Sequence, residues 1–383
     1  MLEKIFSSSA KWGETWSDST FYLYIFIFIS VTIFAFLSEN TGYFIVKTKK
    51  YIYIPKQKIN IFFFLSSYLV ASFFLIFRDV GMDLVTYRDI FSNANSTSIE
   101  SYYIEPGYYL LNNLLHSVTD NEYTAISLIS FILINLIFIT IWKYSKFIDV
   151  GCAICAFIGM FYFQSFSLLR IYLASFILLF TFPIIEKGYK KYIVSILVTT
   201  FIHYSAIVML IPIGSYWIYK NKKKLFWIFY ILLFITFYYI SDIFSLINIA
   251  RYAHYSDIQD DKYGLGFGQF ILHIPLVLFY YYIKIKYPKQ KEIDLLLIYI
   301  LYSLFFGLIG YKSSIIGRIS THFSILYIII IPYFIHRLKD YNDHNFQLIK
   351  ALYILYISFR LYLYFKEYLY LDGIMPYKNY LIN

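Results

Sequence analysis

The sequence predicts an all-α, polytopic membrane protein of about 12 transmembrane helices with an outward-facing cavity. Three observations lead to this prediction: of 383 residues, 60% are hydrophobic and 23% aromatic, whereas only 15% are charged. A water-soluble domain has about a quarter of its residues charged. Because apolar runs fill the chain from end to end, we expect residues 1–383 to form a single integral membrane domain.

Apolar runs long enough to cross a hydrocarbon core of about 30 Å account for most of these helices. They lie at residues 21–38, 59–77, 123–142, 147–164, 168–186, 225–241, 268–285, 293–311, 319–336 and 346–365. The first run lacks a small-residue cleavage site, so it is expected to be a retained helix and not a signal peptide.

Lysines gather between these runs, and the positive-inside rule places such loops in the cytoplasm. The clusters are at residues 47–58, 143–146, 187–191, 220–224, 284–291 and 339. The segment 192–219 joins two of these clusters. Because both clusters are expected in the cytoplasm, the chain must enter the membrane and return to the cytoplasmic side within this segment. A helix from Tyr192 to His203 rises only about 18 Å, too little for a full crossing. We therefore expect a turn at His203, near the outer rim, and both termini outside.

Two long loops are expected on the outer side, at residues 78–122 and 242–267. In the first, Pro106 is suited to the first turn of a helix. Tyr108, Leu111 and Leu115 would share one face of that helix, which suits a segment lying flat on the membrane.

Arginine follows the opposite distribution to lysine. On this topology only Arg337 is inside, and the outer arginines are Arg78, Arg88, Arg170, Arg251, Arg318 and Arg360. A guanidinium matches phosphate oxygens with a planar fork of donors, so this asymmetry favours an outward site for a phosphorylated ligand. Arg170 and Arg318 are also expected at helix starts, where the helix dipole favours an anion. Alternatively, these arginines reach lipid headgroups without binding a ligand. Arg78, at the carboxyl end of its helix, would also complement the helix dipole.

Other functional classes find little support in the sequence. The formal net charge of +10 is spread over small groups between apolar runs, so we expect no nucleic-acid partner. The two cysteines, Cys152 and Cys155, lie inside an apolar run without the polar context of a redox or zinc pair. We expect neither a cofactor nor a metal.

Several motifs resemble the EpsG-type branch of bacterial polysaccharide polymerases, which is related to the O-antigen polymerase Wzy. They are RDVGMDLVTY (Arg78 to Tyr87), E-P-G-Y (Glu105 to Tyr108), SLLRIYLA (Ser167 to Ala174), FIHYSAIV (Phe201 to Val208) and P-Y-K (Pro376 to Lys378). The resemblance implies an inner-membrane glycosyltransferase with its active site facing the periplasm. Its donor and acceptor would be oligosaccharide repeats on undecaprenyl pyrophosphate, and its partner would be a membrane protein that regulates chain length.

In such a reaction an acceptor hydroxyl attacks an anomeric carbon, and undecaprenyl pyrophosphate leaves. The minimum requirements are cations for the leaving group and a base for the hydroxyl proton. We assign Arg78, Arg170 and Arg318 to the pyrophosphates, with Arg251 as a weaker candidate. His203 and Glu105 both remain candidates for the base.

Gly81, Asp83 and Tyr87 are expected to shape the substrate loop. The G-x-D spacing fits a tight turn in which Gly81 supplies the permissive backbone, and Tyr87 is a plausible platform for a sugar ring, as are Tyr102, Tyr103, Tyr108 and Tyr109. As an alternative, Asp79, Asp83 and Asp89 would gather a divalent cation, although their spacing fixes no ligand geometry.

Two other membrane functions remain open. A flippase for lipid-linked oligosaccharides usually carries ionisable groups near the bilayer midplane, where each unpaired group costs about 3 kcal/mol to insert. The central parts of the apolar runs in this sequence are nearly free of charged residues. An O-antigen ligase would use the same donor and a similar outward set of arginine and histidine. The order of the motifs favours the polymerase over both.

Overall fold

The computed structural model describes residues 16–40, 58–94, 104–183, 189–246, 266–288, 292–312, 314–341, 343–369 and 371–381. Apart from one pair of two-residue strands, the regular structure of these residues is helical, as predicted. The chain divides into two compact units. Unit 1 comprises Met1–Ser98, Tyr109–Phe180 and Tyr327–Asn383; unit 2 comprises Ile99–Tyr108 and Thr181–Leu326.

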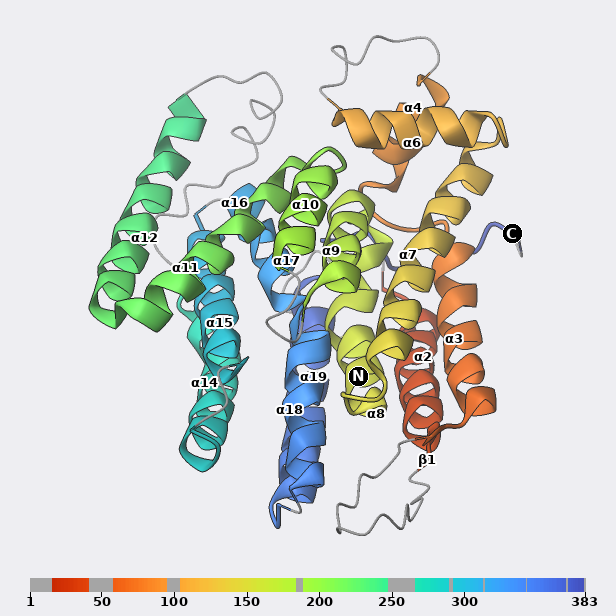
Figure 1. The fold of residues 1–383 in the computed structure, drawn as a ribbon. Coiled ribbons are helices and arrows are strands. Elements are labelled where there is room, and N and C mark those ends of the chain that lie inside the picture. Colours follow the sequence, from red (N-terminus) through yellow and green to blue (C-terminus); the bar gives the residue numbers. More distant parts are fainter. Residues whose placement is uncertain are drawn as a thin grey trace. The chain divides into compact units, whose positions relative to one another are not determined.

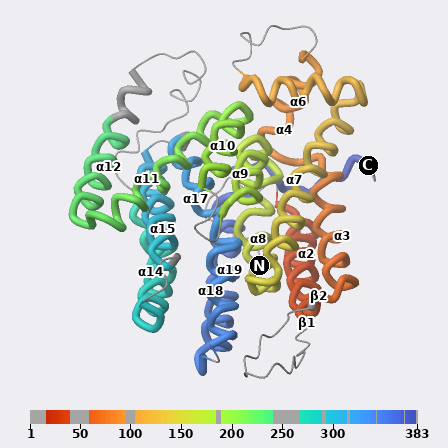
Figure 2. The backbone as a smooth tube through the Cα atoms, in the orientation of Figure 1, coloured from red at the N-terminus to blue at the C-terminus, as the bar shows by residue number. Residues whose placement is uncertain are grey.

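Unit 1 begins with a hairpin of two apolar helices joined through a short strand pair, which Figure 2 traces at the red end of the chain: α2 (Asp18–Leu37), β1 (Glu39–Asn40), β2 (Lys58–Ile59) and α3 (Ile61–Ile76). Both helices begin at a capped residue. The side chain of Ser17 accepts from the N–H of Thr20, and that of Asn60 accepts from the N–H of Phe62. These caps satisfy backbone donors that the first helical turn leaves without partners.

The remaining helices of unit 1 include one that is buried on every side. They are α4 (Leu84–Ser92), α7 (Glu122–Tyr144), α8 (Val150–Phe157), α9 (Leu169–Thr181), α18 (Tyr327–Asp340) and α19 (Phe346–Glu367). Every residue of α8 is buried, because the helix is apolar all round and α2, α18 and α19 pack on it. Its end widens into a π-turn, η2 (Ile158–Tyr162), followed by a 3₁₀ turn, η3 (Gln164–Phe166). There the helical hydrogen-bond ladder ends, and backbone carbonyls need other donors.

Unit 2 contains α10 (Tyr189–Thr200), η4 (Tyr204–Met209), α11 (Leu210–Asn221), α12 (Lys223–Leu246), α14 (Gly268–Lys286), α15 (Glu292–Ile309), α16 (Ser314–Arg318) and α17 (Ser320–Ser324). Helices α14 and α15 lie side by side (Figure 1), and the rings of Phe306 and Phe323 stack at 5.2 Å between α15 and α17. The chain turns at His203, between α10 and η4. With 12 residues, α10 is too short to cross a bilayer, as the sequence predicts.

Among the described residues, five helices are long and apolar enough to span a membrane, so the chain is a multi-pass membrane protein. These are Asp18–Leu37, Glu122–Tyr144, Gly268–Lys286, Ile316–Asp340 and Phe346–Glu367. Shorter apolar helices lie at Ile61–Ile76, Val150–Tyr162, Leu169–Thr181 and Ile293–Ile309. Each apolar run identified in the sequence overlaps helical structure, although 147–164 covers α8 and η2 and reaches η3, and 319–336 is divided between α17 and α18. The total of 12 spans and the orientation remain predictions.

Helix α6 (Pro106–His116) begins at Pro106, as predicted. The face expected to meet lipid is covered by protein instead, because Tyr108 and Leu115 are buried. The apolar side chains that α6 exposes are Leu110 and Leu114, one turn apart on another face.

Candidate functional site

Arg78 follows α3, and only 2% of it is exposed. Its Nε–H donates to the Phe166 carbonyl at 3.0 Å, and its Nη2 donates to the Ser165 carbonyl at 3.3 Å. Its Nη1 donates to the Leu75 carbonyl and, at 2.8 Å, to Ser130 Oγ. Four of the five guanidinium N–H donors therefore have protein acceptors.

The carbonyls that Arg78 binds are at helix ends. Leu75 is in the last turn of α3, and Ser165 and Phe166 form the end of η3. A cation at the carboxyl end of a helix both satisfies orphan carbonyls and complements the helix dipole. Burial lowers the pKa of Arg78 to about 10, so the side chain is still a cation at neutral pH. Arg78 thus ties two helix ends together, and its assignment to a pyrophosphate stays a prediction.

Gly81 adopts the conformation for which the sequence analysis singled it out. Its φ is 135°, and a Cβ there would lie 2.5 Å from the Phe166 carbonyl oxygen. The predicted tight turn is present, since the N–H of Leu84 donates to the Gly81 carbonyl at 3.1 Å. Asp83 is the N-cap residue of α4, and its backbone N–H donates to Ser167 Oγ at 3.3 Å. Only glycine fits at position 81, where the backbone approaches the Phe166 carbonyl so closely.

The C-terminal tail of unit 1 folds back across the same loop. The N–H of Asp79 donates to the Lys378 carbonyl, and that of Met82 donates to the Asp372 carbonyl, both at 2.8 Å. Between these contacts, the Tyr377 hydroxyl donates to the Phe74 carbonyl at 3.1 Å. The P-Y-K stretch therefore supports the loop that carries Arg78, a role that the sequence pattern alone does not reveal.

Tyr87 and Arg170 meet next to this loop. Tyr87, on α4, is 3% exposed, so in this structure it is not an open platform for a sugar ring. Arg170 is the second residue of α9, as predicted, and is half-buried. Its guanidinium carbon lies 5.5 Å from the centre of the Tyr87 ring, a cation–π contact. Burial raises the pKa of the Tyr87 phenol, and the Arg170 charge opposes that rise.

The acidic residues that the structure describes in the loop have different surroundings and do not form a metal-binding group. Asp79 forms an ion pair with Arg88 at 3.0 Å, and the Arg88 guanidinium lies 4.6 Å from the Tyr123 ring centre. Asp89 is exposed. Within the described part of the chain, no three His, Cys, Asp or Glu side chains are grouped so as to hold a metal ion.

In unit 2 the structure brings together the two candidates for the base. His203 Nδ1 lies 3.1 Å from Glu105 Oε1, although the residues are 98 positions apart. The Glu105 side chain is 1% exposed, whereas that of His203 is 23% exposed. When Nδ1 carries the ring proton and donates a hydrogen bond to the carboxylate, Nε2 is left as a proton acceptor. The pair can therefore act as one general base.

The E-P-G sequence explains how Glu105 reaches His203. Pro106 begins α6, where its missing N–H costs nothing. The N–H of Gly107 donates to the Phe201 carbonyl at 2.7 Å, and a Cβ on Gly107 would lie 2.8 Å from that oxygen. A glycine at this position lets the start of α6 touch the backbone of the turn that carries His203.

Two further polar residues of unit 2 lie beside this pair. Ser205 Oγ is 2.8 Å from Nε2 of His322, which is fully buried, and the His203 and His322 rings are 6.1 Å apart between centres. Ser205 lies in the FIHYSAIV motif, but neither it nor His322 was predicted as a site residue. A signal was present, because His322 is a lone histidine in an apolar run, one helical turn after Arg318.

The two remaining arginine candidates are Arg318 and Arg251. Arg318 is half-buried and is the last residue of the short α16. In α16 it therefore lies at the carboxyl end, where the helix dipole does not favour an anion, although it is also the third residue of the longer apolar span Ile316–Asp340. Arg251, like Tyr102 and Tyr103, lies outside the described residues.

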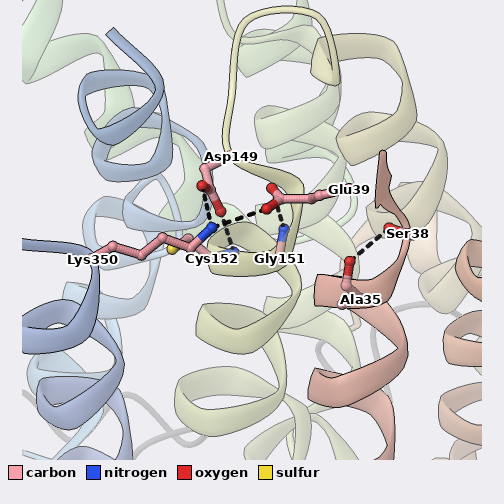
Figure 3. A network of polar contacts seen from close by, with 7 residues as sticks. All are labelled: Ala35, Ser38, Glu39, Asp149, Gly151, Cys152 and Lys350. Carbon is pink, nitrogen blue, oxygen red and sulfur yellow. Dashed lines mark hydrogen bonds and ion pairs between the residues drawn. The ribbon is translucent and has the colours of Figure 1, made fainter. Parts of the chain in front are cut away.

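A buried charged cluster lies at the opposite end of unit 1 from Arg78. Figure 3 shows the Lys350 ammonium between two carboxylates, at 2.6 Å from Asp149 and 2.9 Å from Glu39. Glu39 also accepts from the N–H of Gly151, and Asp149 accepts from the N–H of Cys152. Burial and the nearby Asp149 charge raise the pKa of Glu39 to about 7. Although burial opposes it, the Lys350 charge holds the pKa of Asp149 below its usual value.

Comparison with known proteins identifies a family for the chain. The EpsG family profile matches residues 60–379 of the chain. No curated protein and no solved structure matches it. The matched range contains every candidate site residue of both units, and the EpsG family is associated with polysaccharide polymerase activity.

Proposed function

Because the chain belongs to the EpsG family, we propose that it is a glycosyltransferase that polymerises lipid-linked oligosaccharides. It transfers a glycan chain from undecaprenyl pyrophosphate onto a single lipid-linked repeat, at the periplasmic face of the bacterial inner membrane. The observation that best supports this chemistry is the Glu105–His203 pair, a partly exposed imidazole backed by a buried carboxylate. A regulator of chain length is the expected protein partner.

The pair supplies the base that the reaction needs. Glu105 accepts a hydrogen bond from the Nδ1–H of His203, which holds that proton on Nδ1 and leaves Nε2 free to accept the proton of the acceptor hydroxyl. Nε2 removes the proton of the acceptor hydroxyl as its oxygen bonds to the anomeric carbon. The bond from that carbon to the pyrophosphate oxygen breaks, and undecaprenyl pyrophosphate leaves with the electron pair. His203 then releases its proton to water.

Arginines would balance the charge of the leaving group. Arg170 combines a half-buried guanidinium with the amino end of α9, and Arg318 supplies a second guanidinium. Arg251 stays a weaker candidate. For Arg78 we now favour an indirect role, because four of its N–H groups are engaged by protein oxygens. It would position the loop of Gly81, Asp83 and Tyr87.

Deletion of the gene tests the proposal, with the surface polysaccharide separated on a gel. A polymerase predicts that the ladder collapses to lipid carrying one repeat, and that the wild-type gene restores it while His203→Gln does not. Loss of all surface repeats would instead indicate a flippase or a ligase. As a control, Trp217→Phe changes an exposed side chain of α11 and should restore the full ladder.

A further inference from the structure

A second hydrogen-bonded pair repeats the design of the Glu105–His203 pair. In each, a partly exposed polar group is held by a buried one. His203 is held by Glu105, and Ser205, itself half-buried, is held by the fully buried His322 across 2.8 Å. Burying a polar side chain is unfavourable unless it is hydrogen-bonded, so each buried member restricts its exposed partner to one position.

The two partly exposed groups lie at the same place in unit 2. His203 and Ser205 are two positions apart at the start of η4, so their Cα atoms are separated by at most about 7 Å. The rings of His203 and His322 are 6.1 Å apart between centres. Both residues are partly exposed, and their Cα atoms are close enough for one sugar to contact the His203 imidazole and the Ser205 side chain.

We propose that Ser205 binds a hydroxyl of the acceptor sugar next to the one that reacts, and that His322 is the positioning residue for Ser205. A serine hydroxyl has one donor and two acceptor positions. Whichever of these His322 engages, the Ser205 oxygen keeps a position for a ligand hydroxyl. The assignment rests on the proposed function, and it makes Ser205 a determinant of acceptor binding and not of proton transfer.

A purely structural tie between η4 and α17 is the alternative explanation, and unit 2 offers a matched control for it. Ser215 and Tyr302 form a similar hydroxyl contact of 2.6 Å, and both are fully buried. Ser215→Ala therefore removes a serine hydroxyl that no substrate can reach. It should lower thermal stability without changing the binding of acceptor.

The experiment uses the full chain in lipid nanodiscs and, as the probe, the single repeat on undecaprenyl pyrophosphate isolated from the deletion strain. Binding of this probe and the KM for it during elongation are measured separately. One neutral hydrogen bond is worth a factor of about 3 to 10. We expect Ser205→Ala to raise both the Kd and the KM by that factor with little change in kcat, and Ser205→Thr, which keeps the hydroxyl, to retain wild-type values.

His322→Phe should reproduce the Ser205→Ala effect, and the double variant should be no worse than either, because the residues act through one another. An unchanged Kd and KM for Ser205→Ala would overturn the inference, and so would equal changes for Ser215→Ala. If the wild type binds the probe but never elongates it, the polymerase function is contradicted. The role of Ser205 is then decided by the binding data alone.

Discussion

Replacing Arg78 by Met separates a structural role from a ligand-binding role. The substitution keeps the apolar stem and removes every guanidinium donor. Three buried carbonyls and one hydroxyl then lose their donor. Each buried acceptor left without a donor costs about 1–3 kcal/mol. Part of this loss is offset, because the variant no longer has to bury a charged guanidinium, which costs several kcal/mol. We expect a net loss of about 2–5 kcal/mol in the free energy of unfolding.

Thermal unfolding of the detergent-purified protein, followed by tryptophan fluorescence, measures this loss. Arg88→Met is the comparison, because Arg88 pairs with one carboxylate, that of Asp79, and contacts the Tyr123 ring. Neither of these contacts is to a helix-end carbonyl, so the loss of stability should be smaller than that of Arg78→Met. A wild-type Tm for Arg78→Met, together with loss of polymerisation, would refute the structural role. That result would favour the direct contact with pyrophosphate that the arginine distribution suggests.

Three further substitutions test other parts of the account. Gly81→Ala should destabilise by about 1–3 kcal/mol in the same unfolding assay, because of its φ of 135°. The control Gly214→Ala lies inside α11, where an added Cβ meets nothing within 4 Å, so it should instead stabilise by about 0.5–1 kcal/mol. Arg170→Lys should abolish the polysaccharide ladder while the protein remains inserted, since lysine lacks the planar fork; a normal ladder would remove Arg170 from the site. The pKa of Glu39 is raised from its ordinary value of 4.5 to about 7 in the folded chain. Between these two pH values the folded chain keeps a proton that the unfolded chain has released, so raising the pH favours unfolding. The Glu39 carboxyl should therefore lower the free energy of unfolding by up to about 3 kcal/mol as the pH rises from 5 to 8. Glu39→Gln should flatten the profile of Tm against pH, and an equally steep profile would contradict the assigned pKa.

The sequence predicted those features that depend on local pattern or on length. Apolar runs located the helices, and the short distance between two lysine clusters placed a turn at His203. Pro106 marked the start of α6, and Gly81 marked a backbone position with positive φ. Each of these follows from the geometry of a few consecutive residues.

Contacts between distant residues lay beyond this reasoning. Glu105 and His203 were alternatives for one role, and only the folded chain shows that they form one pair. The C-terminal tail carries no hydrophobic period that would indicate its backbone hydrogen bonds to the Arg78 loop. Arg78 itself shows the limit of charge counting, since the side of a guanidinium can be predicted from topology but its acceptors cannot.

The most direct test of the account is chain growth by the purified protein, supplied only with single repeats on undecaprenyl pyrophosphate. Mass spectrometry should detect glycans of two or more repeats and one released undecaprenyl pyrophosphate for each bond formed. Glu105→Gln should slow this growth, and His203→Gln should abolish it without changing the binding of the lipid-linked repeat. Chain growth at the wild-type rate by His203→Gln would contradict the account.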